Sequence, residues 1–149
     1  MHDLETLNKL LKDELAATET YQQVLNEFRE NTEPGEAKYL MLIYKAHKDV
    51  VSRLQAQICQ LGGTPRDISA AWITWTTIVL KGANLLGKRA ILKTLQKEEQ
   101  RGAEKYKQAL HDIELPSYVR SLIEWKLLYA QQSHLRTLNQ LLSGGLSRL

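Results

Sequence analysis

The chain has 149 residues, of which 43% are hydrophobic and 25% are charged, as in an ordinary soluble globular protein. This length predicts one domain, residues 1–149, because it can bury a substantial core but is short for two domains. The formal net charge is only +3, and the basic residues are interspersed with acidic ones, which argues against nucleic-acid binding. The single cysteine, Cys59, excludes an internal disulfide framework and a cysteine-based zinc site.

The N-terminal residues, MHDLETLNKLL, lack the basic start and apolar run of a signal peptide. No segment is long and apolar enough to span a bilayer. We therefore expect a cytoplasmic protein that does not enter a membrane.

A first helix is predicted from about residue 3 to residue 30, where the sequence Asn31-Thr-Glu-Pro-Gly35 ends the pattern. Inward positions recur every three or four residues, as one buried helix face requires. They are Leu4, Leu7, Leu11, Glu14, Thr18, Tyr21, Leu25 and Phe28. Burying an ionisable side chain is costly without a partner, so Glu14 is a candidate functional residue.

A second helix is predicted over residues 36–61, with Gly62-Gly63 as its stop and Pro65 just beyond. Its inner face again contains one ligand-type residue, His47. The face is formed by Leu40, Ile43, Tyr44, His47, Val51, Leu54, Ile58 and Leu61.

The next connection, residues 64–87, is long for two helices that simply turn back on each other. Residues 69–81 within it read as a short helix that contains Trp72 and Trp75. A connection of this length can cross from one end of a helical bundle to the other. Its apolar residues predict either a cap on the bundle or a surface for a homodimer or another protein partner.

Two further helices are predicted, over residues 88–112 and 116–143, and no strand pattern is present. The inner face of the first contains Leu92, Leu95, Glu99, Tyr106 and Leu110. The inner face of the second contains Ile123, Leu127, Gln131, His134, Leu138 and Leu141. Four long helices in two hairpins joined by a crossover predict an all-α four-helix bundle.

Each long helix thus has one ligand-type residue near the middle of its apolar face: Glu14, His47, Glu99 and His134. In an antiparallel bundle, residues near helix midpoints lie at one level, so the four side chains could converge. Two carboxylates and two imidazoles suit one Fe, Mn or Zn ion. The alternative is metal-free, with the same residues forming buried Glu–His pairs in a structural or interaction protein.

Several of these residues resemble the ferritin-like superfamily of the bacterioferritin type. The matching motifs are Glu14-Leu15-x-Ala17 with Tyr21, His47, Leu61-Gly62-Gly63-Thr64-Pro65, Glu99, and His134-Leu135-x-x-Leu138. The resemblance implies a ferritin-like four-helix bundle in which helices one and three each supply a Glu. It also implies that helices two and four each supply a Glu-x-x-His motif.

Over nearly its full length the chain is more similar to DUF2383, a bacterial ferritin-like family of unknown function. The similar segments are Leu7-Asn8-x-Leu10-Leu11, Leu61-Gly62-Gly63-x-Pro65, Trp75, Glu99 with Tyr106-x-x-Ala109-Leu110, and Leu115-Pro116-x-x-Val119-Arg120.

The chain departs from the superfamily pattern because Tyr44 and Gln131 occupy the Glu positions of both Glu-x-x-His motifs. Two remaining carboxylates neutralise one divalent ion, not two. We therefore expect a degenerate one-ion site with a role in metal or stress handling and no robust catalysis. A third alternative, an active di-metal oxidoreductase, would need a further carboxylate such as Glu98.

Residues that could support such a site complete the sequence-based expectation. Tyr21 and Tyr106 are expected to hydrogen-bond the polar residues through their hydroxyls. Tyr44 and Gln131 are expected near the ligands, one turn before each histidine.

Overall fold

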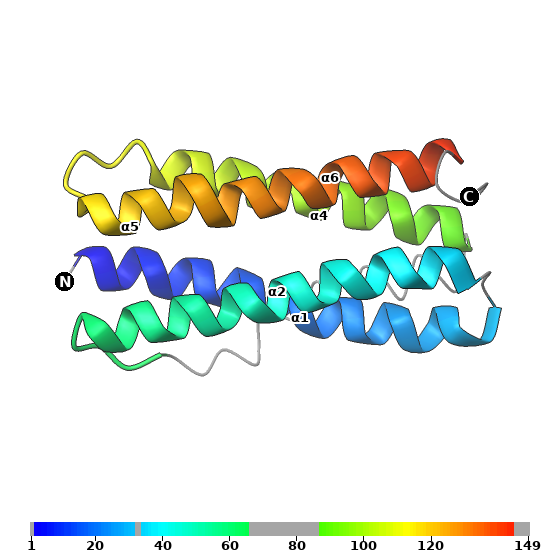
Figure 1. Cartoon of the computed structure of the whole chain (residues 1–149), viewed down its shortest axis with the longest axis horizontal. Coiled ribbons are helices and arrows are strands. Elements are labelled where there is room, and N and C mark those ends of the chain that lie inside the picture. The colour runs from blue at the N-terminus through cyan, green and yellow to red at the C-terminus, as the bar shows by residue number, and fades with distance from the viewer. Residues whose placement is uncertain (1, 32–33, 66–86, 145–149) are drawn as a thin grey trace.

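The computed structural model of the chain describes residues 2–31, 34–65 and 87–144, and these form an all-helical bundle with no strand. The predicted all-α class is therefore confirmed for the described part of the chain. The helices are α1 (His2–Asn31), α2 (Pro34–Gln60), α4 (Lys88–Ala109), α5 (Ser117–Leu122), a π-helical turn η1 (Ile123–Leu127), and α6 (Leu128–Ser143). The last three elements follow one another as a single rod (Figure 1).

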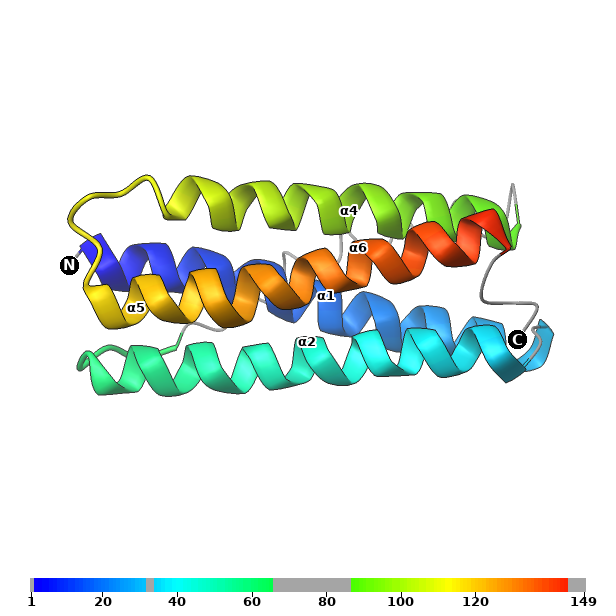
Figure 2. The same cartoon turned by 45° about the horizontal axis from the view of Figure 1, so that its top comes forward.

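The rods are arranged as two antiparallel hairpins, α1 with α2 and α4 with α5–α6 (Figures 1 and 2). Across the interface between the hairpins, α1 contacts α4 and α2 contacts α6. The C-terminal end of α2 and the N-terminal end of α4 lie at opposite ends of the bundle (Figure 1). This placement agrees with the predicted crossover, whose short helix at residues 69–81, with Trp72 and Trp75, lies outside the described residues.

Glycines with positive φ lie just beyond two of the helix ends. Gly62 has φ 83° and Gly144 has φ 81°, a left-handed conformation that a residue with a Cβ adopts at a cost. The glycine pair after α2 therefore ends that helix as predicted. The end of α4 was predicted too late, at residue 112. The helix stops at Ala109, and beyond its end the Arg120 guanidinium donates to the carbonyls of Leu110 (2.6 Å) and Asp112 (2.5 Å).

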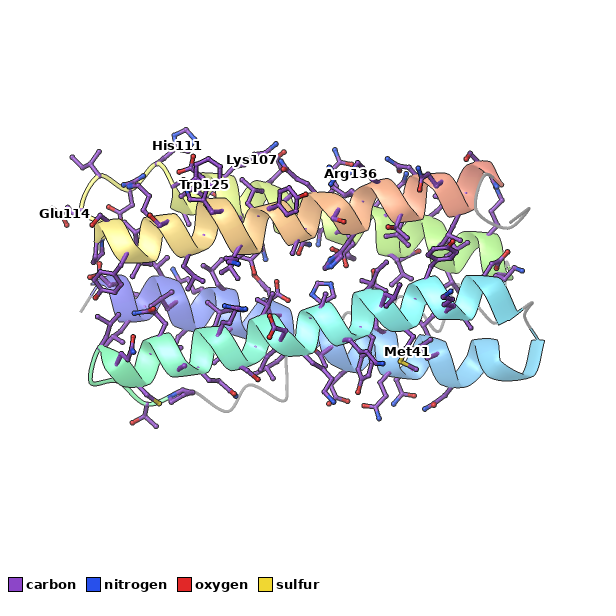
Figure 3. The ribbon with its side chains drawn as sticks, in the orientation of Figure 1. Met41, Lys107, His111, Glu114, Trp125 and Arg136 are labelled. Carbon is purple, nitrogen blue, oxygen red and sulfur yellow. The ribbon has the colours of Figure 1, made fainter. Side chains whose placement is uncertain are left out.

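The π-helical turn in the last rod was not predicted. The buried residues around it, Val119, Ile123, Leu127 and Gln131, follow one another at intervals of four. An α-helix has 3.6 residues per turn, so intervals of four rotate the apolar face away from the core. A π turn accommodates more residues and keeps all four side chains buried. Trp125, inside this turn, points outward and is 71% exposed (Figure 3).

The core consists of two apolar clusters with a polar layer between them. One cluster joins Tyr21 and Val24 of α1 to residues of α2, α4 and α6, among them Leu40, Leu95 and Leu138. The other joins the first turns of α1 to the second half of α2, the end of α4 and the α5–η1 segment. The residues between the two clusters are the polar ones that the sequence singled out. No described helix combines the length and the apolar character that a bilayer crossing requires.

Candidate metal centre

Glu14, His47, Glu99 and His134 lie at one level of the bundle, one from each rod, and all four are buried. Each helix brings its residue there because the apolar positions on both sides of it are buried in the two clusters. The predicted convergence of the four side chains is thus observed. How they meet differs from a simple ring of four ligands.

The imidazole of His47 lies between the two carboxylates. Its Nδ1 is 2.5 Å from Oε2 of Glu14, and its Nε2 is 2.6 Å from Oε1 of Glu99. The side chains of His47 and Glu99 are each only 1% exposed, so both contacts are shielded from water. His47 of α2 therefore links Glu14 of α1 to Glu99 of α4.

Two tyrosine hydroxyls complete the hydrogen bonding of the carboxylates. Tyr21 donates to Oε1 of Glu99 at 2.8 Å, and Tyr106 donates to Oε1 of Glu14. The Tyr21 ring also stacks on the His47 ring, with centroids 5.3 Å apart. The predicted supporting roles of these tyrosines agree with their positions. Both oxygens of Glu14 are thereby engaged, one by Tyr106 and one by His47.

The second histidine, His134, contacts the other carboxylate oxygen of Glu99. Its Nδ1 lies 3.4 Å from Oε2 of Glu99, and its ring centroid is 4.7 Å from that of His47. Among the described residues, Oε2 of Glu99 thus has only this long contact with a histidine, whereas Oε1 accepts shorter hydrogen bonds from both His47 and Tyr21. The contact of His134 with Glu99 is longer than either contact of His47 with a carboxylate.

Burial and neighbouring charges shift the pKa values of His47, Glu99 and the two tyrosines of the layer. Burial lowers the pKa of His47, but the Glu99 and Glu14 carboxylates raise it more, so it lies well above its ordinary value. Burial raises the pKa of Glu99, but His47 and His134 lower it more, so it lies well below its ordinary value. Burial and the same carboxylates raise the pKa values of Tyr21 and Tyr106, which keeps both hydroxyls protonated as donors.

Gln131 and Tyr44, three residues before His134 and His47, have different surroundings. The Gln131 amide donates to the backbone carbonyl of Glu99 at 3.0 Å and packs against Gly102, where a Cβ would overlap it. It therefore supports the segment of α4 that presents Glu99. Tyr44 is partly buried against the first apolar cluster, with the Lys48 ammonium 5.3 Å from its ring centroid. Neither contact involves the four polar residues, so its expected place near the ligands stays a prediction.

Three of the four expected ligands could hold a metal ion. One ligand atom from each of His47, Glu99 and His134 lies within 4.8 Å of the other two. A tetrahedral Zn²⁺ site binds nitrogen and oxygen ligands at about 2.0–2.2 Å, which places these ligand atoms about 3.3–3.6 Å apart. A spacing of 4.8 Å would therefore have to shorten by about 1.2–1.5 Å for the three residues to bind one ion. Two histidines and one carboxylate are a donor set used by iron(II) and zinc sites that keep open coordination positions.

Glu14 is outside this group of three because it contacts the other ring nitrogen of His47. Metal-bound histidines usually donate their second ring N–H to a carboxylate or carbonyl, which orients the ring. Glu14 occupies that supporting position. The helical spacing of the sequence could place Glu14 in the layer but could not show which nitrogen it would contact.

A small cavity of about 100 Å³ lies beside the layer, between α1 and α4. Glu14, His47 and Glu99 line it, together with Gly102 and Gln131. His134 instead lines a groove of about 330 Å³ between α2 and α6. The polar layer is thus approached from two faces of the bundle. This cavity was not predicted from the sequence.

Comparison with known proteins identifies no relative. No protein-family model, no curated protein and no solved structure matches the chain.

Proposed function

We propose that this chain is a ferritin-like helical protein that binds a single transition-metal ion through His47, Glu99 and His134. The observation that carries the proposal is that one ligand atom from each of these three buried residues lies within 4.8 Å of the other two. Glu14 contacts Nδ1 of His47, the position from which a carboxylate orients a metal-bound histidine. The ion would be Fe, Mn or Zn, and its handling, in metal supply or stress protection, would be the protein's role.

Charge balance supports one ion in preference to two. Glu14 and Glu99 together offset one divalent cation, and their oxygens already have donors in Tyr106, His47 and Tyr21. A di-metal oxidoreductase would need Glu98 as well. Glu98 lines the cavity, but its carboxylate is 3.4 Å from the Arg101 guanidinium, which offsets its charge. A single ion is therefore the better fit.

A metal-free role is the second candidate, and one observation favours it. The two contacts of His47 and the two tyrosine donors form a closed hydrogen-bonded network with no added ion. Such a network can keep a core unique without binding anything. The protein would then be a structural or interaction bundle.

Elemental analysis separates these candidates. The protein is purified without chelator or metal-affinity resin, then stripped and reloaded with Fe²⁺, Mn²⁺ or Zn²⁺. We expect about one ion per chain, and none in a His47→Ala, His134→Ala double variant. A His111→Ala variant is the matched control, because His111 is exposed and lies outside the layer. A wild-type chain that retains no ion after reloading would favour the metal-free candidate.

The double variant removes two buried side chains, so its folding must be checked by circular dichroism. A His134→Gln variant keeps a side chain of similar length but removes the imidazole ligand. It should fold and bind the ion much more weakly. Two ions per chain with oxygen consumption would instead support the di-metal alternative.

A further inference from the structure

The outer side of the α5–η1–α6 rod exposes large aromatic side chains. Tyr118, Trp125 and Tyr129 are each more than half exposed, and Trp125 points away from the bundle (Figure 3). Only two other large hydrophobic side chains of the described residues, Leu42 and Ile113, are exposed. Tryptophan and tyrosine are enriched where proteins bind one another, because each combines a large apolar area with a polar tip. This rod therefore has the side chains of an interaction surface.

The aromatic residues belong to a stripe of outward positions that is symmetric about Trp125. The positions are 118, 121, 125, 129 and 132, in steps of three and four along the rod. Equal steps from Trp125 therefore lead to Ser121 and Tyr118 in one direction, and to Tyr129 and Gln132 in the other. A second copy that runs antiparallel, about a two-fold axis at Trp125, would place Tyr129 over Ser121 and Tyr118 over Gln132. Each tyrosine then lies opposite a side chain without a ring, which allows the two faces to interdigitate.

Two charged residues extend this symmetry beyond the aromatic stripe. Glu114, in the connection before α5, is eleven residues before Trp125, and Arg136 of α6 is eleven residues after it. Figure 3 shows Trp125 between the two along the length of the bundle. Both side chains are exposed, and neither forms an ion pair with another described residue. A parallel pair of rods would bring like charges together, whereas an antiparallel pair brings each Glu114 to the Arg136 of the other copy.

We propose that two copies of this chain form a dimer through the outer side of the α5–η1–α6 rod, antiparallel about a two-fold axis at Trp125. The two Trp125 side chains pack against each other at the axis. The match between the two halves of the stripe assigns the face to a second copy, since an unrelated partner would not require it. Such an interface is isologous, so it closes with two copies. The pairing does not depend on the proposed metal site.

Sedimentation velocity of the full-length, metal-stripped chain over a range of concentrations tests the dimer. We expect a monomer–dimer equilibrium for the wild-type chain, and a dissociation constant at least about tenfold higher for Trp125→Glu. Leu42→Glu is the matched control, because it introduces the same charge at an exposed apolar position on α2, outside the stripe. Circular dichroism checks that both variants keep their helical content.

Three results of this experiment would overturn the proposal. A wild-type chain that stays monomeric would leave the face to a different partner. Assemblies that grow beyond two copies would contradict a closed two-fold interface. Equal weakening by Trp125→Glu and Leu42→Glu would show that the copies do not meet at Trp125.

Charge reversal tests the antiparallel arrangement. Glu114→Arg and Arg136→Glu should each weaken the dimer several-fold, because each variant places like charges opposite one another. The two substitutions together restore opposite charges, so the double variant should dimerise nearly as well as the wild-type chain. A double variant no stronger than either single variant would show that Glu114 does not meet Arg136, and it would overturn the antiparallel pairing.

Discussion

His47 and Glu14 meet at 2.5 Å through Nδ1 and Oε2, and the opposite nitrogen of the same ring lies 2.6 Å from Glu99. A single imidazole therefore separates two carboxylates that would repel each other if they were in direct contact. This relationship gives the two glutamates different roles in the proposed site. In that proposal Glu99 is a ligand, and Glu14 orients the histidine.

A Glu14→Gln variant tests this division of roles. We expect it to keep one ion per chain but to bind it 10- to 100-fold more weakly, the usual effect of losing a carboxylate behind a metal-bound histidine. Glu99→Gln should lose the ion almost completely. Competition with a chromophoric chelator measures both affinities, and Asp13→Asn controls for the loss of a nearby charge. Equal losses in the two variants would mean that Glu14 is itself a ligand.

The stability of the metal-free protein should depend on pH through His47. Its pKa is raised on folding, so its contribution is complete below the ordinary value of 6.5 and is lost as the pH rises through the folded-state pKa. The pKa of Glu99 is lowered, so its contribution is present above 4.5 and is lost only as the pH falls further. We expect the free energy of unfolding to decline above about pH 6.5, by up to about 1.4 kcal/mol per pH unit.

Urea unfolding of the chelator-treated protein between pH 6 and pH 9 measures this decline. A His47→Gln variant should be less stable at pH 6 and should lack the His47-dependent part of the slope. Parallel curves for the two proteins would show that His47 does not carry the proton in the folded state.

The buried tyrosine hydroxyls should stabilise the fold. Tyr21→Phe and Tyr106→Phe each remove a donor to a buried carboxylate, which costs about 1.5–3 kcal/mol for a hydrogen bond to a charged group. Tyr129→Phe is the control because Tyr129 is 65% exposed, and it should change stability little. Denaturant titration of all three variants gives the comparison. A loss no larger than that of Tyr129→Phe would show that the hydroxyls contribute little.

The packing of Gly102 against Gln131 should appear as a coupling between two substitutions. Gly102→Ala alone places a Cβ where the Gln131 amide lies, so we expect a loss of about 1–3 kcal/mol from overpacking and from the displaced hydrogen bond to Glu99. In a Gln131→Ala background the Cβ has room, and the same substitution should cost much less. A double-mutant cycle of unfolding free energies measures the difference. Additive effects would argue against a close contact.

Much of the architecture could be predicted because burial follows a simple period along each helix. The apolar positions around Glu14, His47, Glu99 and His134 place each residue at mid-helix on an inward face, and the structure brings all four to one layer. The π turn left a signal as well, in the intervals of four from Val119 to Gln131. That signal indicates a departure from α-helical geometry but not its exact position.

The sequence by itself determined the four long rods, their inward faces and the polar residue on each, because helical periodicity is local. Only the tertiary structure decided that His47 lies between Glu14 and Glu99 and that His134 meets the other oxygen of Glu99. The rotation of each helix about its axis and the rotamer of each buried side chain depend on partners from other helices. Those partners are distant in the chain, so no local pattern can specify them.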